Sequence, residues 1–211
     1  MNRRNWNRRR LTIMAFVVYW SSFGAQATDA LKVVTNPCVG VEVGASTYKL
    51  GQPISDLLMI TGIAEKIVSD TYNDEIAKLM SKDEYQAGYL ANTRSHVYIN
   101  AGMIITEDEY ERIKSMTFYV TGDKILGDDI IKPANVRTAE WISVGSSLNE
   151  IVRVYGEPYA KTSDNVFRYE RVTVYYRRGS DVLSFRFHDG VLHDIGIHSK
   201  YLPYLRQREG R

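Results

Sequence analysis

The sequence predicts an α+β fold made of two tandem repeats, each with short helices packed on an antiparallel β-meander. A block at residues 50–62 recurs at 144–156. Each copy has the apolar spacing of a short amphipathic helix. Runs rich in β-branched and aromatic residues, separated by turn residues, follow each copy. The chain has 211 residues, 44% hydrophobic and 25% charged, which is an ordinary globular composition.

The N-terminus predicts export from the cytoplasm. Five arginines between Arg3 and Arg10 have no acidic residue among them, and a mainly apolar run follows at 11–20. Ala25-Gln26-Ala27 has the small residues that a signal peptidase recognises, so residues 1–27 are predicted to be a signal peptide. The apolar run is shorter than the roughly 20 residues that span a bilayer. Retention of this segment as a membrane tether is the alternative. Residues 28–42 are then the N-terminal segment of the mature chain.

Charge argues against a nucleic-acid partner. The whole chain has 27 basic and 25 acidic residues, but residues 1–27 hold five of the arginines and no acid. The mature chain therefore has 22 basic and 25 acidic residues, a net charge of −3. Nucleic-acid binding surfaces are basic, so we expect none here. Cys38 is the single cysteine, which leaves a buried thiol or an intermolecular disulfide open.

The first repeat is predicted at residues 43–132. Gly51 allows a tight turn and Pro53 suits the start of a helix. The first repeat is longer than the second after the shared block, which indicates a helical insertion at 63–94. The places where two repeats differ are where specificity is expected.

The second repeat is predicted at residues 138–198, followed by a basic tail at 199–211. Ser147 and Glu150 form a capping box at the start of its helix, and Gly156 is placed to end that helix. In the last hairpin we expect a three-residue loop with Gly190 in a left-handed bulge. This register pairs three residues of one strand with three of the next: Phe187 with Val191, Phe185 with His193, and Leu183 with Ile195.

Three segments of the second repeat carry a resemblance to known proteins. They are Val144-Gly145-Ser146-Ser147-Leu148-Asn149-Glu150-Ile151, Tyr155-Gly156-Glu157-Pro158 and Phe185-Arg186-Phe187-His188-Asp189-Gly190-Val191. This pattern resembles the SmpA/OmlA (BamE-like) small envelope proteins and, as a tandem pair, the β-lactamase-inhibitor-protein-like fold. The resemblance implies a non-catalytic binding module, either an assembly factor of the outer membrane or an inhibitor that lays a concave sheet on an enzyme.

Catalytic and metal-binding patterns are weak in this chain. It contains no Gly-x-Ser-x-Gly, no phosphate loop and no dinucleotide fingerprint. His188, His193 and His198 cluster in the last hairpin, but the expected register spreads them along the strands. We therefore assign no catalytic residue, no cofactor and no metal ligand. A metal-dependent hydrolase, which needs these histidines to converge with a carboxylate, is kept as an alternative.

Tyrosine is the compositional excess, at 15 residues. Tyrosine is enriched at protein interfaces, although it also suits the interior of a strand. The candidate protein-binding surface consists of Tyr169, Tyr175, Tyr176, Tyr201 and Tyr204. The sequence thus predicts a non-catalytic, exported protein-binding module of the bacterial cell envelope, periplasmic or secreted, with an assembly or scaffold role. The partner is another protein, and a secreted inhibitor of an enzyme is the alternative.

Overall fold

The computed structural model describes residues 31–35, 40–43, 46–69, 93–124, 130–166, 169–179 and 181–199. The predicted signal peptide, Cys38, most of the predicted helical insertion and nearly all of the basic tail lie outside these residues. Within the described residues, strands far outnumber helices.

The described elements are β1 (Lys32–Val34), β2 (Val41–Val43), β3 (Ser46–Tyr48), α2 (Ile54–Thr61), β4 (Lys66–Ser69), β5 (Arg94–Tyr98), β6 (Met103–Glu107), β7 (Ile113–Tyr119), β8 (Asp123–Lys124), β9 (Ile130–Ile131), β10 (Val136–Thr138), α5 (Leu148–Tyr155), β11 (Ala160–Val166), β12 (Tyr169–Arg178), β13 (Asp181–His188) and β14 (Val191–Ser199).

These strands form one large sheet and two smaller ones. The large sheet has eight strands in the order β11-β12-β13-β14-β7-β6-β5-β4, and a second has the order β10-β1-β2-β3. Strands β8 and β9 pair with each other. The run β4–β7 and the run β11–β14 are joined where β14 pairs antiparallel with β7, from Asp194 opposite Tyr119 to His198 opposite Ser115.

The predicted α+β fold of helices on a meander is wrong, because the protein is mostly β-sheet. The described residues contain only two helices, each eight residues long. The strands β1, β2, β3 and β10 have three residues each, so they are too short to show a hydrophobic period in the sequence. They lie in the expected N-terminal segment, at the start of the first repeat and at the junction between the two repeats, and they form a second sheet over the core.

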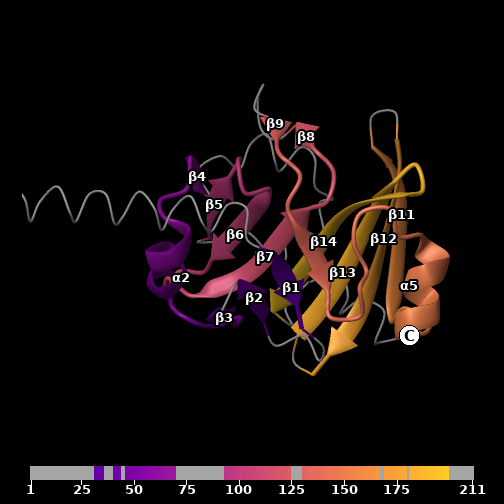
Figure 1. The fold of residues 1–211 in the computed structure, drawn as a ribbon, viewed down its shortest axis with the longest axis horizontal. Coiled ribbons are helices and arrows are strands. Elements are labelled where there is room, and N and C mark those ends of the chain that lie inside the picture. Colours follow the sequence, from indigo (N-terminus) through magenta and orange to yellow (C-terminus); the bar gives the residue numbers. More distant parts are fainter. Residues whose placement is uncertain are drawn as a thin grey trace, which may run out of the picture.

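The two helix blocks are nonetheless alike in their backbone. Gly51 and Gly145, which precede the helices, have φ of 83° and 85°, and Gly62 and Gly156, which end them, have φ of 75° and 79°. The predicted capping box of α5 is confirmed, with Ser147 Oγ accepting from the Glu150 N–H and the Glu150 carboxylate accepting from the Ser147 N–H. Helix α2 begins after Pro53 without a side-chain cap. The two helices lie at opposite ends of the molecule (Figure 1).

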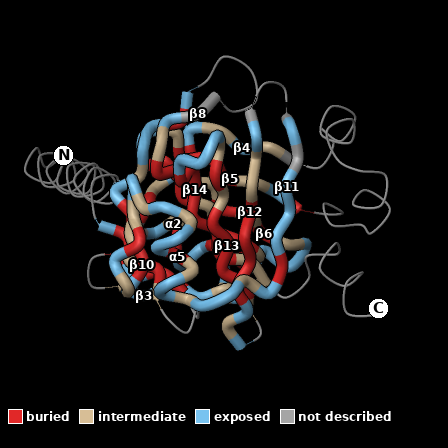
Figure 2. Tube along the Cα trace, turned by 90° about the vertical axis from the view of Figure 1, so that its right-hand side faces the viewer, coloured by how far each residue is buried: buried red, intermediate tan, exposed pale blue. Residues whose placement is uncertain are grey.

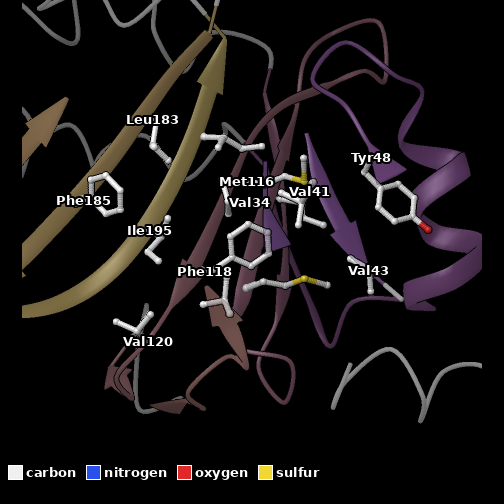
Figure 3. Close-up of a cluster of buried hydrophobic side chains, with 14 of the residues drawn as sticks. Val34, Val41, Val43, Tyr48, Met116, Phe118, Val120, Leu183, Phe185 and Ile195 are labelled. Carbon is white, nitrogen blue, oxygen red and sulfur yellow. The ribbon is translucent and has the colours of Figure 1, made fainter. Parts of the chain in front are cut away.

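The main hydrophobic core lies between the two sheets. Figure 3 shows Val34, Val41 and Val43 of the four-stranded sheet facing residues such as Phe118 and Ile195 of the eight-stranded sheet. Buried residues follow the middle strands of the large sheet, whereas the edge strand β11 is exposed along most of its length (Figure 2). We call the side of the large sheet that meets this core its core face, and the opposite side its second face.

The predicted register of the last hairpin is wrong. Asp189 and Gly190 form a two-residue loop, both with positive φ, so that His188 pairs with Val191 and Phe187 with Leu192. A β-bulge then places His193 as an extra residue, and Phe185 pairs with Ile195 instead of His193. The carbonyl of His193 accepts from the Val120 N–H at 2.9 Å, so this bulge is stabilised by the end of β7.

Candidate functional site

The predicted tyrosine surface is not formed by the two described tyrosine side chains. Tyr175 and Tyr176 are 6% and 2% exposed, and they point to opposite faces of the large sheet. Tyr176 packs in the core against Phe185, and its hydroxyl donates to the Gly156 carbonyl at 3.1 Å. The side chain of Tyr169 and the whole of Tyr201 and Tyr204 lie outside the described residues. Because side chains alternate along a strand, Tyr175 and Tyr176 cannot contribute to one surface, although they are adjacent in the sequence.

A buried carboxylate on the second face gathers two of the predicted histidines. Asp194 Oδ2 lies 3.0 Å from His193 Nδ1 and 3.4 Å from Arg186 Nη1. The His188 ring stacks on His193 at 3.8 Å between centres. Burial alone would raise the pKa of Asp194, but the nearby Arg186 and the hydrogen bond from His193 outweigh it and hold that pKa below its usual value. The cluster thus neutralises a buried charge.

His198 makes a separate contact with a serine. Its Nε2 lies 2.9 Å from Ser184 Oγ, and the ring lies over Gly196, where an added Cβ would meet Nε2 at 2.5 Å. Burial and, to a lesser degree, Arg186 lower the pKa of His198 to about 4, so the ring is neutral near pH 7. Its Nδ1 is buried without a hydrogen-bond partner in the described part of the chain. The carboxylate that orients the base of a Ser-His-Asp triad is therefore not in place there.

The described histidines are not arranged as metal ligands. Among the described residues, no three His, Cys, Asp or Glu side chains come together in a way that could hold a metal ion. His188 and His193 are stacked ring on ring, which does not direct two nitrogen lone pairs to one point.

An exposed residue with a left-handed backbone lies in the turn from Thr138 to Ile142, between β10 and α5. The Thr138 N–H donates to the Ile142 carbonyl at 2.8 Å and the Trp141 N–H donates to the Thr138 carbonyl at 3.0 Å. The Ile142 N–H donates to Thr138 Oγ1 at 3.2 Å. This closed turn requires a left-handed residue at its fourth position, which is normally glycine or asparagine. That residue is Trp141, with φ of 70°.

The Trp141 side chain faces solvent and is held in place. It is 73% exposed, the Arg137 guanidinium carbon lies 3.8 Å from its ring centre, and Arg137 Nη1 donates to the Thr138 carbonyl at 3.1 Å. Exposed Val144 follows in the same loop. A large, ordered aromatic ring beside an arginine has the composition of the residues that dominate protein interfaces. The sequence does not predict Trp141 as a site residue, because turn preferences favour a small residue at this position.

Comparisons with protein-family models, curated proteins and solved structures find no match for this chain. Neither of the two described helices is long and apolar enough to cross a membrane.

Proposed function

We propose that this protein is an exported, non-catalytic binding module that anchors a protein partner on Trp141. The observation that carries the proposal is the combination of a 73% exposed indole with a left-handed backbone. For a residue with a Cβ, this left-handed conformation costs roughly 1–2 kcal/mol because the Cβ comes too close to the following carbonyl oxygen. Little burial within the chain offsets this cost, since most of the ring faces water.

A partner that covers the ring supplies the missing stabilisation. Tryptophan and arginine are enriched among interface residues whose truncation costs about 2 kcal/mol or more. Because Arg137 stacks on the ring, the indole needs little further ordering when a partner binds. Backbone strain held at one exposed side chain is typical of binding sites.

Export and the absence of catalysis rest on other observations. The basic, apolar and small-residue segments within residues 1–27 support a signal peptide. In the part of the chain that the structure describes, the Ser184–His198 pair has no carboxylate to orient the histidine, which supports a structural role for the pair. A secreted enzyme inhibitor would use the same surface on an enzyme partner.

Site-specific photocrosslinking tests the proposal. The photoreactive residue p-benzoylphenylalanine replaces Trp141 in one variant and Tyr110 in the control, because Tyr110 is similarly exposed, at 72%, on another turn. The full chain is expressed in its native cell, irradiated and purified, and adducts are identified by mass spectrometry. We expect a reproducible protein adduct at position 141 that is missing at position 110. If position 141 gives no adduct, or both positions give the same ones, the proposal is wrong.

A further inference from the structure

Three arginines stack on aromatic rings around α5. The pairs, with the distance from guanidinium carbon to ring centre, are Arg137 on Trp141 at 3.8 Å, Arg177 on Tyr159 at 4.0 Å and Arg178 on Tyr155 at 5.0 Å. Significant stacks of this kind occur roughly once per 70–80 residues. Three of them around one eight-residue helix are a local concentration of ordered guanidinium groups.

Two of these arginines are held in place by both a ring stack and a hydrogen bond to a backbone carbonyl. Arg137 Nη1 donates to the Thr138 carbonyl at 3.1 Å, and Arg178 Nη1 donates to the Arg177 carbonyl at 2.8 Å. A guanidinium has five N–H donors. In the described part of the chain, Nε of both arginines is buried without a hydrogen-bond partner, so an acceptor from solvent has to bind the terminal Nη groups of these half-buried side chains. Because these arginine side chains are already ordered, they lose little conformational entropy when an acceptor binds them.

Two carboxylates of this region, those of Glu140 and Glu150, already have hydrogen-bond donors. Arg178 lies over the Tyr155 ring, and the Tyr155 hydroxyl donates to Glu140, the residue before Trp141. Burial, more than any other cause, raises the pKa of Tyr155, which keeps its hydroxyl a donor. Glu150 accepts from Ser147 in the capping box. The surface therefore combines these two hydrogen-bonded carboxylates with guanidinium groups that can donate to another anion.

We propose that Arg137 and Arg178 bind the carboxylates of an acidic segment of the protein partner that Trp141 anchors. The inference rests on the proposed function and adds the chemistry of the partner. A planar guanidinium binds a carboxylate through two parallel N–H bonds, and the neighbouring indole offers apolar contact to the same segment. Lysine has neither the planar fork nor the stacking, so it cannot replace these arginines.

Fluorescence anisotropy of a labelled oligo-glutamate peptide, titrated with the full chain at low salt, tests this inference. We expect saturable binding that weakens with salt and is absent for an oligo-glutamine peptide of the same length. Arg137→Gln and Arg178→Gln should each raise the dissociation constant about tenfold or more. Arg137→Lys, which keeps the charge, should not restore the affinity of the original protein. The matched control is Lys49→Gln, which removes the same charge from an exposed residue beside α2 and should change the constant by less than about twofold.

Several results would overturn the inference. They are no binding of oligo-glutamate, an equal loss with Lys49→Gln, or tighter binding of a single-stranded oligonucleotide or a phosphatidylglycerol vesicle than of the peptide. Circular dichroism shows whether each variant is folded, and Arg137→Gln carries the test if Arg178→Gln is not. A crosslinked partner at position 141 that binds both arginine variants normally would overturn this inference alone. Arginine-dependent peptide binding without any adduct would instead count against the proposed function.

Discussion

Two turns of this molecule share one hydrogen-bond pattern and use it differently. In the turn at 108–112, the Asp108 N–H donates to the Arg112 carbonyl at 2.9 Å and the Glu111 N–H donates to the Asp108 carbonyl at 3.0 Å. These are the same positions that close the turn at 138–142. In each turn the side chain of the first residue accepts from the fifth N–H. The left-handed residue is Glu111 in one and Trp141 in the other.

The difference lies in what the left-handed residue contacts. The carbonyl of Glu111 accepts from the Ile54 N–H at 2.8 Å, so the first turn closes the start of α2. Helix α2 has no side-chain cap, which makes this backbone contact its substitute. Trp141 instead presents its ring to solvent under Arg137. The same backbone geometry thus supports a helix end in one place and an exposed aromatic ring in the other.

The largest expected effect on stability comes from the difference in burial between the two turns. Thr138→Val removes the acceptor of the Ile142 N–H, and both residues are buried. An unsatisfied buried N–H costs about 1–3 kcal/mol. Asp108→Ala also removes acceptors, but from exposed N–H groups that water can satisfy, so its cost should be nearer about 0.5–1 kcal/mol. Urea unfolding measures both. Equal costs would mean that the two turns are equally solvated.

A smaller effect of opposite sign is expected at Glu111. Glu111→Gly relieves the left-handed strain and keeps the carbonyl that accepts from Ile54. After the entropy lost by glycine, the free energy of unfolding should rise by about 0.5–1 kcal/mol. The control is Glu109→Gly. Glu109 is an exposed residue of the same turn without a positive φ, so glycine there relieves no strain and should destabilise the protein. A loss of stability in Glu111→Gly would show that its side chain supports the turn.

The smallest effect on stability is expected at Trp141. Trp141→Gly relieves the same strain but loses the stack with Arg137, so the free energy of unfolding should change by less than about 0.5 kcal/mol. A buried tryptophan would cost about 3–5 kcal/mol. Urea unfolding decides between these values. A cost above about 2 kcal/mol would mean that the ring serves the fold, and the contrast with Glu111 would disappear.

Local chemistry was predictable and long-range pairing was not. The capping box and the glycines that bound both helices follow from residues within a few positions of one another. The register of the last hairpin depends on the His193 bulge, whose carbonyl accepts from the N–H of Val120, the residue after β7, more than seventy positions earlier in the chain. The residues of the hairpin alone do not indicate that contact. The prediction of a three-residue loop, which was based on them, is therefore wrong.

The candidate site shows the same division. Composition groups the tyrosines into one surface, but the pleat of β12 places Tyr175 and Tyr176 on opposite faces of the sheet, and both are buried. Trp141 is instead an exposed aromatic residue at a turn position where propensity predicts glycine. A site that departs from local preference cannot be found by rules that encode local preference.

The sequence by itself determined the helix blocks, the turn residues and most of the strands of the second half, because short-range sterics and hydrogen bonds decide these. Only the tertiary structure decided that the protein is mostly β, that three-residue strands form a second sheet over the core, and that β7 joins β14. Those outcomes depend on the free energy gained when distant segments bury apolar surface against each other, and this gain arises only once the segments are in contact.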